Sequence, residues 1–389
     1  MVVAVTDLIS LRWVVEGSFG AGADSAAMAD MRITGESLEQ TTENRRSNEL
    51  RDDAQIEDDK RVNIGVTGSV EGLLSYETWD SWMQYALRSS GWSTVKTNTD
   101  ITYSMANADN SINDSANQFV VDGFVANQWV EIRGFTDSAN NGFFKLTSVA
   151  AGKMVLAGGT VATEAAGDSV TITMGAQITN GTTLNSMSIE REYSSPASEF
   201  VEYKGCVIDG MTIGINAKEL VTVSFDIMGK SATSGTATAG DGSPTAVNAN
   251  LTYSAQENVT TVWENNSSIE GTLLNFSVRN NYRMRDMVLG TLGADSAGAG
   301  KFECSGELQM LYESKTIMDK YLNYTDTSIA VVLEDASGNA YLIEVVEANY
   351  TSGRRVAGGE NEDIIADMAF AGHRDSSEDV TLRIAKFAA

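Results

Sequence analysis

The residues that could do chemistry are few in this chain, and none has the spacing that catalysis requires. His373 is the only histidine and follows a glycine at the end of a predicted strand, where a solvated turn residue is a commoner role than a general base. The run Gly229-Lys230-Ser231 matches the end of a phosphate-binding loop, but that motif needs a further glycine where this chain has Ser224. No G-x-S-x-G nucleophile elbow occurs in the sequence. The sequence therefore predicts a protein that is not an enzyme, with no catalytic residues.

Acidic pairs and cysteines are the remaining candidates for metal binding. Asp52-Asp53 and Asp58-Asp59 could hold a hard cation, but their spacing is not that of a calcium loop. Basic residues are interleaved with them, namely Arg45, Arg46, Arg51, Lys60 and Arg61. Mixed signs favour salt bridges between proteins over a metal cage. Cys206 and Cys304 lie on separate predicted strands and match no metal site, which favours small core residues over a disulfide. No metal and no cofactor is predicted.

Composition bounds the class of protein. The chain has 389 residues, a hydrophobic fraction of 42% and 2 prolines, which is typical of a folded protein of two or three domains. Abundant Ser, Thr, Asn and Gly with short alternating runs indicate a mainly β fold. The formal net charge of −26 disfavours adhesion to nucleic acid and to anionic membranes. The start MVVAVTDLISLRW lacks the pattern of a secretion signal, and no apolar run reaches the roughly 18 residues that span a bilayer.

One stretch, residues 32–91, must position whatever surface this chain uses. It begins with RITGESL, passes through a long charged loop and enters an alternating strand, VNIGVTGSVEGLLS. The apolar face of that strand holds Val62, Ile64, Val66, Val70 and Leu74. Its polar face holds Asn63, Thr67, Ser69 and Glu71. The period then becomes helical, with Trp79, Trp82, Met83, Ala86 and Leu87 before the stop signal Ser89-Ser90-Gly91. The unit is therefore a strand, a loop, a half-buried strand and an amphipathic helix.

The same unit is predicted a second time in the C-terminal half. Residues 301–322, KFECSGELQMLYESKTIMDKYL, follow the pattern of 63–84 at a constant offset. The matched positions are Gly68 with Gly306, Leu73 with Leu311, Thr78 with Thr316, Trp79 with Ile317, and Met83 with Tyr321. Upstream, 273–283 takes the place of RITGESL, and downstream 364–374 corresponds to 221–231. We expect an internal duplication.

The predicted order of domains follows from these repeats. Residues 1–31 form an N-terminal strand and a flexible arm. Residues 32–105 and 176–230 form the first repeat, and 261–389 form the second repeat. Between the two parts of the first repeat, 106–175 has several short strands of its own and predicts an inserted small β-barrel-like domain, with 104–117 as a polar linker into it. Residues 231–260 contain little that could pack and predict a flexible linker.

These blocks resemble the tail tube (major tail) proteins of long-tailed, siphovirus-type bacteriophages. The resemblance rests on RITGESL, on the run from NELRDDAQIEDDKRVNIG to SWMQYAL, on FVVDGFVANQWVEIRGFTDSANNGFFKLTSV, on NGTTLNSMSIEREY and on RNNYR with SGELQMLYE. It covers nearly the whole chain, with the blocks in the expected order. The resemblance implies two tandem tail-tube-type β-sandwich or barrel domains, each with one packing helix, plus the inserted domain.

The resemblance also implies a function. Such proteins form rings that stack into the hollow tail through which the DNA genome leaves the capsid, and strands of neighbouring subunits pair to close the barrel. The implied partners are further copies of the chain, the tape-measure protein, and the tail terminator and distal tail proteins. Double-stranded DNA would pass without specific binding, and no membrane is involved. The protein would reside in the virion tail after assembly in the host cytoplasm.

On this resemblance, the polar strand faces are candidates for the channel wall. The residues are Thr34, Glu36, Asn63, Thr67, Ser69, Glu71, Ser224 and Asp226 in the first repeat, and Asn275, Ser277, Glu303, Glu307, Gln309 and Asp367 in the second. They could equally be ordinary solvent-facing strand residues, and the sequence does not separate the two interpretations.

The charged loop 39–61 is too long for a hairpin connection and too charged to be buried, so we expect it to contact the adjacent ring. The contact residues would be Arg45, Arg46, Arg51, Asp52, Asp53, Glu57, Asp58, Asp59, Lys60 and Arg61. A solvated loop without a partner is the alternative. The duplication favours a trimeric ring with pseudo-sixfold symmetry over a ring of six chains.

Two other classes of protein fit part of the sequence. A secreted or surface-assembled β-rich structural protein, pilus-like or surface-layer-like, would share the acidity and the β content but would require a signal peptide in its precursor. A hydrolase on a β-sandwich would need converging polar groups, and the sequence indicates none.

Overall fold

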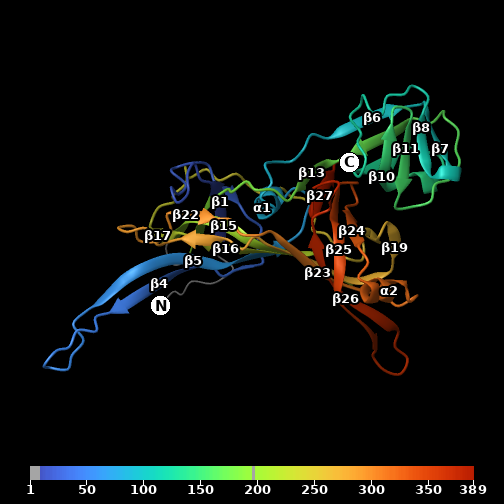
Figure 1. The fold of residues 1–389 in the computed structure, drawn as a ribbon. Coiled ribbons are helices and arrows are strands. Elements are labelled where there is room, and N and C mark those ends of the chain that lie inside the picture. The colour runs from blue at the N-terminus through green and yellow to red at the C-terminus, as the bar shows by residue number, and fades with distance from the viewer. Residues whose placement is uncertain (1–8, 195–197) are drawn as a thin grey trace.

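The computed structural model describes residues 9–194 and 198–389 and is built almost entirely of antiparallel strands (Figure 1). Before the insertion the elements are β1 (Ile9–Val15), β2 (Ala29–Asp30), β3 (Gly35–Glu36), β4 (Glu39–Arg46), β5 (Asp59–Leu73) and helix α1 (Asp80–Ala86). After it come β13 (Ala176–Thr179), β14 (Met187–Tyr193), β15 (Glu199–Asn216), β16 (Thr222–Gly229) and β17 (Ser231–Gly235).

The C-terminal half supplies the remaining strands of the body. They are β18 (Val259–Glu264), β19 (Ser267–Ile269), β20 (Gly271–Arg279), β21 (Arg283–Arg285), β22 (Ser296–Gly298), β23 (Glu303–Leu311), β24 (Thr327–Glu334), β25 (Ala340–Ala357), β26 (Ile364–His373) and β27 (Leu382–Phe387), with helix α2 (Thr316–Asn323) after β23. The mainly β fold predicted from the sequence is confirmed.

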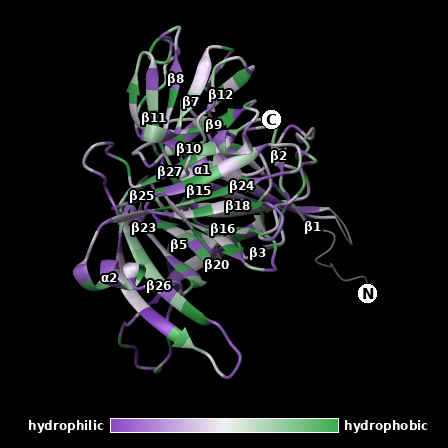
Figure 2. Ribbon diagram, turned by 90° about the vertical axis from the view of Figure 1, so that its right-hand side faces the viewer, coloured by the Kyte–Doolittle hydropathy of each residue, from purple (hydrophilic) through white to green (hydrophobic). Residues whose placement is uncertain are grey.

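A continuous central sheet runs through both repeats. β3 and β4 pair with β5, β5 with β16, β16 with β15, β15 with β20, β20 with β23, β23 with β26, and β26 with β25. The joint between β15 and β20 makes the two repeats one sheet. The sheet curves as a half-barrel, and hydrophobic and hydrophilic residues follow one another along its strands (Figure 2).

The two repeats have the same pairing order, and their long strands share one bulge. The order β5–β16–β15 matches β23–β26–β25, and both long strands carry a bulge, between Ile208 and Gly210 in β15 and between Tyr350 and Ser352 in β25. A Cβ at Gly68 would lie 2.4 Å from Ser37 O, and one at Gly306 would lie 2.1 Å from Asn275 O. Both glycines are therefore required because the neighbouring strand approaches too closely for a side chain.

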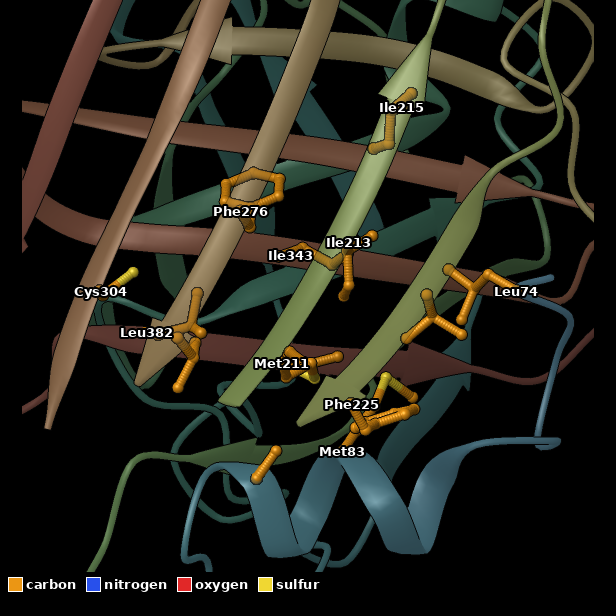
Figure 3. Close-up of a cluster of buried hydrophobic side chains, with 14 of the residues drawn as sticks. Leu74, Met83, Met211, Ile213, Ile215, Phe225, Phe276, Cys304, Ile343 and Leu382 are labelled. Carbon is orange, nitrogen blue, oxygen red and sulfur yellow. The ribbon is translucent and has the colours of Figure 1, made fainter. Parts of the chain in front are cut away.

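The apolar face of the central sheet packs against α1 and an outer layer of strands (Figure 3). Trp79, Trp82 and Met83 of the α1 segment are at most 1% exposed, and both tryptophan rings contact Phe225 of β16. The helix ends when Arg88 adopts a positive φ of 53° and Ser89 N donates to Gln84 O. In the second repeat the short helix α2 buries Ile317 and Met318. The first part of β25, up to Ala348, pairs with β24 and β27 in the outer layer and contributes side chains such as Ile343, whereas its later part pairs with β26 in the central sheet (Figure 3).

The inserted domain is a separate seven-stranded sheet with its own core. Its strands are β6 (Lys96–Asp100), β7 (Tyr103–Ala106), β8 (Ser111–Asp114), β9 (Trp129–Arg133), β10 (Gly142–Ala150), β11 (Lys153–Ala157) and β12 (Val170–Met174), with 3-10 turns η2 (Asn107–Asp109) and η3 (Ser138–Asn140). β6 pairs with β12, so the sheet begins ten residues before the predicted boundary. Residues 104–117 are not a linker, because Met105 and Ile112 are buried in this core and the Asp114 carboxylate accepts the backbone N–H of Ala116 and Gln118.

The segment expected to be a flexible linker, 231–260, is fastened to the body. Its first residues form β17, which pairs with β15. Further on, Tyr253 is fully buried, its N–H donates to Leu74 O, and its C=O accepts from Val221 N. The prediction was wrong because a few anchoring contacts hold a segment whose overall composition is small and polar.

The charged stretch 39–61 forms a long hairpin instead of a loop. β4 pairs with β5 from Glu39 opposite Thr67 to Arg46 opposite Asp59, and only 47–58 form the tip. This arm projects from the body (Figure 1). The ladder satisfies the backbone hydrogen bonds, so exposed charged side chains on both faces are tolerated, which the composition did not reveal.

Cys206 and Cys304 are buried free thiols, so the prediction of two core cysteines is confirmed. Within 9–194 and 198–389, no helix is long and apolar enough to cross a membrane.

Candidate functional site

The open face of the central sheet, the face that neither the helices nor the outer strands cover, is a polar surface assembled from both repeats. On β5, Thr67 and Glu71 are exposed while Val66 and Val70 are buried. The same alternation continues on the other strands. The predicted channel-wall residues on this face are Thr67, Ser69, Glu71, Ser224, Asp226, Asn275, Ser277, Glu303, Glu307, Gln309 and Asp367.

Hydrogen bonds between strands hold the side chains of the open face. The hydroxyls of Ser37 and Ser69 lie 3.0 Å apart, and Thr212 Oγ1 donates to Ser277 Oγ at 3.4 Å across the joint between the repeats. Register therefore brings residues distant in sequence onto one surface.

Acidic side chains predominate over basic ones on the open face. Glu71, Asp226 and Glu307 are exposed there. Arg354 of β25 donates from Nε to the Asp367 carboxylate at 2.7 Å, and Arg279 lies opposite Glu303 in the register of β20 and β23. The two arginines balance only part of the carboxylate charge.

Glu36 is a correction to the predicted wall. It lies opposite Val70, on the packed face, and its carboxylate accepts hydrogen bonds from Arg191 Nη2 and Leu38 N. Arg191 also donates to Leu38 O at 2.7 Å and is 6% exposed. The register of the strand therefore places Glu36 on the packed face, where its carboxylate supplies the counter-charge for the buried Arg191. Thr34 is exposed, but the alternation of the strand places it on the side of Glu36.

Asn63 lies where the arm leaves the body. Its side-chain amide donates to Asp286 Oδ2 at 2.5 Å, in the segment 280–302 that separates β20 from β23. In the same region, a Cβ at Gly293 would lie 3.0 Å from the Ile64 side chain, so this segment of the second repeat rests on the first.

The predicted contact residues all lie on the arm, and several pair with one another. Arg51 binds the Asp53 carboxylate through two bonds of 2.9 Å and also pairs with Glu57, while Lys60 lies 2.5 Å from Asp58. The Arg51 guanidinium lowers the pKa of Asp53, and the Lys60 ammonium lowers the pKa of Asp58. The other residues predicted to make this contact also lie on the arm, namely Arg45, Arg46, Asp52, Asp59 and Arg61.

Exposed apolar side chains lie at the ends of the projecting segments. Leu50 is fully exposed at the tip of the arm. Met287 and Leu289 are 94% and 99% exposed in the segment between β21 and β22. Isolated exposed apolar residues are common, but adjacent ones at protruding tips are typical of protein contact surfaces.

Lys230 and His373, which are isolated candidates for chemistry in the sequence, contact other residues of the fold. The Lys230 side chain packs on Gly20 and Gly205, since a Cβ at either glycine would lie within 3 Å of it. His373 Nε2 lies 3.6 Å from Glu347 and 3.8 Å from Asp326. These three residues are the group in the described chain whose ligand atoms are close enough to hold a metal ion.

A buried charge cluster that the sequence did not indicate holds the inserted domain on the second repeat. Glu344 of β25 is fully buried between Lys145 of β10 and Arg383 of β27, at 2.7 Å from each. Burial raises the pKa of Glu344, but the two cations outweigh it and the net pKa is lowered. Around the cluster, the ring centroids of Trp129 and Trp263 lie 4.8 Å apart, and the Phe143 ring contacts the Phe387 ring. Only the three-dimensional fold brings these distant residues together.

The fold and this surface define a half-barrel β protein with a polar open face, uncovered sheet edges and projecting hairpins. A family model described as phage tail tube protein matches residues 6–372. The chain therefore belongs to the phage tail tube protein family, and it is a structural component of the phage tail that self-assembles into a tube. A search of curated proteins found no match.

Proposed function

We propose that this chain forms closed rings, that the rings stack into the tail tube of a long-tailed phage, and that the DNA genome passes through the bore during ejection. The observation that carries this proposal is the central sheet, which runs from β4 to β25 through both repeats. Its two edges, β4 on one side and β25 beyond Ala348 on the other, have no further strand partner among the described residues. Free edges invite pairing with another chain, and closure into a ring removes them.

The open face would line the bore. Its exposed carboxylates, including Glu71, Asp226 and Glu307, would repel phosphate over about one Debye length, which is about 10 Å at 0.1 M salt. DNA would then slide without sticking to the wall. Asn63 would lie at the rim, where Asp286 holds it.

The two repeats would act as two tube domains in each subunit. The matched pairing order and bulges support this proposal. Three chains would then provide six equivalent positions, so we propose a trimeric ring with pseudo-sixfold symmetry. A ring of six chains is the alternative.

Stacking would use the hairpins at the two ends of the sheet. At one end of the sheet, β16 stops at Gly229 opposite Val66, and β5 continues past this point into the arm. At the other end of the sheet, β23 stops at Leu311 opposite Ile365, and the tip of the hairpin of β25 and β26 lies past this point. Each ring would thus present one kind of hairpin upward and another downward, and the arm's charged residues would contact the adjacent ring.

The tube would surround the tape-measure protein and end at the tail terminator and distal tail proteins, after assembly in the host cytoplasm. The inserted domain, docked on the outer strands of the second repeat, would decorate the outside.

Electron microscopy of the purified protein tests the proposal. We expect rings or tubes in which each ring contains three chains and appears sixfold at low resolution. Six whole chains per ring would overturn the trimer, and discrete monomers with catalytic turnover would overturn the structural function. Flat arrays or pilus-like fibres without a bore would support a surface-assembled protein instead.

A second experiment tests the bore. In assembled tubes, the triple variant Glu71→Lys, Asp226→Lys and Glu307→Lys would retain short double-stranded DNA that the native tube releases, and salt would weaken this retention. Glu257→Lys is the matched control, because Glu257 is exposed on the connecting segment away from the open face. Equal retention by both variants would overturn the assignment of the open face to the bore.

A further inference from the structure

The joint between the two repeats is a complete example of an edge-to-edge contact in this chain. β15 and β20 pair from Gly210 opposite Arg279 to Asn216 opposite Leu273. On the open face of this joint, Thr212 lies opposite Ser277. After β20 the chain crosses onto the first repeat, where Asn280 is fully buried and its amide donates to Ala86 O at the end of α1.

Each strand of this joint has an equivalent at a free edge. β25 is equivalent to β15, because both carry a bulge at the same point and Gly353 lies opposite Met368 as Met211 lies opposite Phe225. The strand 35–46 is equivalent to β20, because the carbonyl oxygen of Ser37 leaves no room for a side chain at Gly68, as that of Asn275 leaves none at Gly306.

Neither equivalent edge has a further strand partner. Beyond Ala348, β25 pairs only with β26 among the described strands, and β4 pairs only with β5. The end of α2 is likewise uncovered. Leu322 and Tyr324 are each 72% exposed there, whereas Ala86 at the corresponding end of α1 is fully buried.

We propose that neighbouring subunits join β25 to the partner's strand 35–46 in the register of the internal joint. This inference rests on the proposed ring and specifies its contact. Matching the two joints residue by residue places Ser352 opposite Thr41 of the partner subunit and Arg354 opposite Glu39 of the partner subunit. The free end of α2 is then covered by the incoming hairpin.

Charge complementarity supports this register. Arg354 is 75% exposed and binds Asp367 through Nε and Nη2, so Nη1 remains to donate to a second carboxylate. Glu39 is exposed on β4, on the face that Arg354 occupies. A register shift of one residue would move Glu39 to the other face of the sheet, away from Arg354. The internal joint has the neutral pair Thr212 and Ser277 at this position, so only the joint between subunits carries the charged pair.

Charge reversal tests the pairing. Glu39→Arg and Arg354→Glu should each reduce the fraction of protein in rings at least tenfold in size-exclusion chromatography, and the double reversal should restore it. Both residues are exposed, so the monomer should stay folded, and only Arg354→Glu, which loses the pair with Asp367, should lower its melting temperature slightly. Lys153→Glu on the inserted domain, which loses an exposed pair with Asp109, is the control. Failure of the double variant to recover, while native rings form, would overturn the register.

Cysteine crosslinking provides a second measurement. Chains carrying Thr41→Cys with Ser352→Cys should form a covalent ladder under oxidation, because directly opposed strand residues have the Cα separation that a disulfide needs. Chains carrying Glu43→Cys with Ser352→Cys should not, since a shift of two residues adds about 7 Å along the strand. The native cysteines are buried and do not interfere. Rings that crosslink only in the shifted pair would overturn this register and leave the proposed function intact, whereas absence of rings in the native protein would overturn both.

Discussion

The two repeats share a sheet but differ in the segment between their first two strands. In the first repeat, β4 and β5 extend into an arm that leaves the body, and its tip pairs Arg51 with Asp53 in solvent. In the second repeat, the segment 280–302 folds back over the first repeat, where Asp286 binds Asn63. Figure 1 shows the arm projecting from the body.

This difference shows which parts of the repeat are constrained. The sheet fixes its glycines and bulges, because neighbouring strands approach within van der Waals contact at Gly68 and Gly306. The segment between the strands faces solvent or a neighbour, so its length and polarity can change without disturbing the ladder. One scaffold thus presents a charged arm in one repeat and an apolar turn in the other.

The largest expected effect concerns the support that only the second repeat receives from the inserted domain. Lys145→Met leaves the buried Glu344 carboxylate with Arg383 alone, and we expect the free energy of unfolding to fall by about 3–5 kcal/mol. Urea unfolding measures the change. Lys153→Met, which removes an exposed pair with Asp109, is the control and should change it by less than about 0.5 kcal/mol. Equal effects would show that the buried pair of Lys145 with Glu344 stabilises the fold no more than an exposed pair does.

The same cluster predicts a pH dependence. The folded-state pKa of Glu344 lies below its ordinary value of 4.5, so its contribution is present above that value and is lost as pH falls through the lower folded pKa. Lys145→Met removes one of the cations that lower this pKa, so the stability of the variant should decline less steeply on acidification. Parallel pH curves for the native protein and the variant would contradict this.

The glycine pair tests the equivalence of the repeats. A Cβ at Gly306 would clash with Asn275 O at 2.1 Å, and one at Gly68 with Ser37 O at 2.4 Å, at a φ of +152°. Gly68→Ala and Gly306→Ala should each lower the free energy of unfolding by about 1–3 kcal/mol in thermal melts. Gly17→Ala, with nothing within 4 Å of its Cβ, should have almost no effect. A neutral Gly68→Ala would break the equivalence.

Removal of the arm's tip separates folding from stacking. Replacing 47–58 by Asn-Gly should change the free energy of unfolding by less than about 1 kcal/mol, because the lost ion pairs are exposed. Electron microscopy should show rings that no longer stack. Full-length tubes from this variant would remove the arm from the contact between rings.

The smallest effect on stability is expected at the apolar turn of the second repeat. Met287→Ser with Leu289→Ser should change the free energy of unfolding by less than about 0.5 kcal/mol, since both side chains are almost fully exposed. Light scattering should show weaker self-association than for the native protein, with Glu257→Lys as the surface control. Unchanged association would make the turn a solvated loop.

The sequence by itself determined which faces of β5, β16, β20 and β23 are packed and which are open, because alternation is a local property of a strand. It placed Thr34 and Glu36 on the wrong face. It also located the glycines that the two repeats share, the amphipathic segments that became α1 and α2, and the family resemblance that the family model confirmed. The charged composition of 39–61 did not predict a hairpin, because hydrogen bonding in a ladder is indifferent to exposed side chains.

The tertiary structure decided what depends on partners far away in the chain. Glu36 faces inward opposite Val70, where the buried Arg191 pairs with it, and Glu344 is buried where Lys145 and Arg383 reach it from two other strands. Neither requirement leaves a local signal, since a buried charge is stabilised by whichever counter-charge the fold brings close. The register that we propose between β25 and the strand 35–46 of the partner subunit likewise depends on the tertiary structure, because it is inferred from the folded joint of β15 with β20.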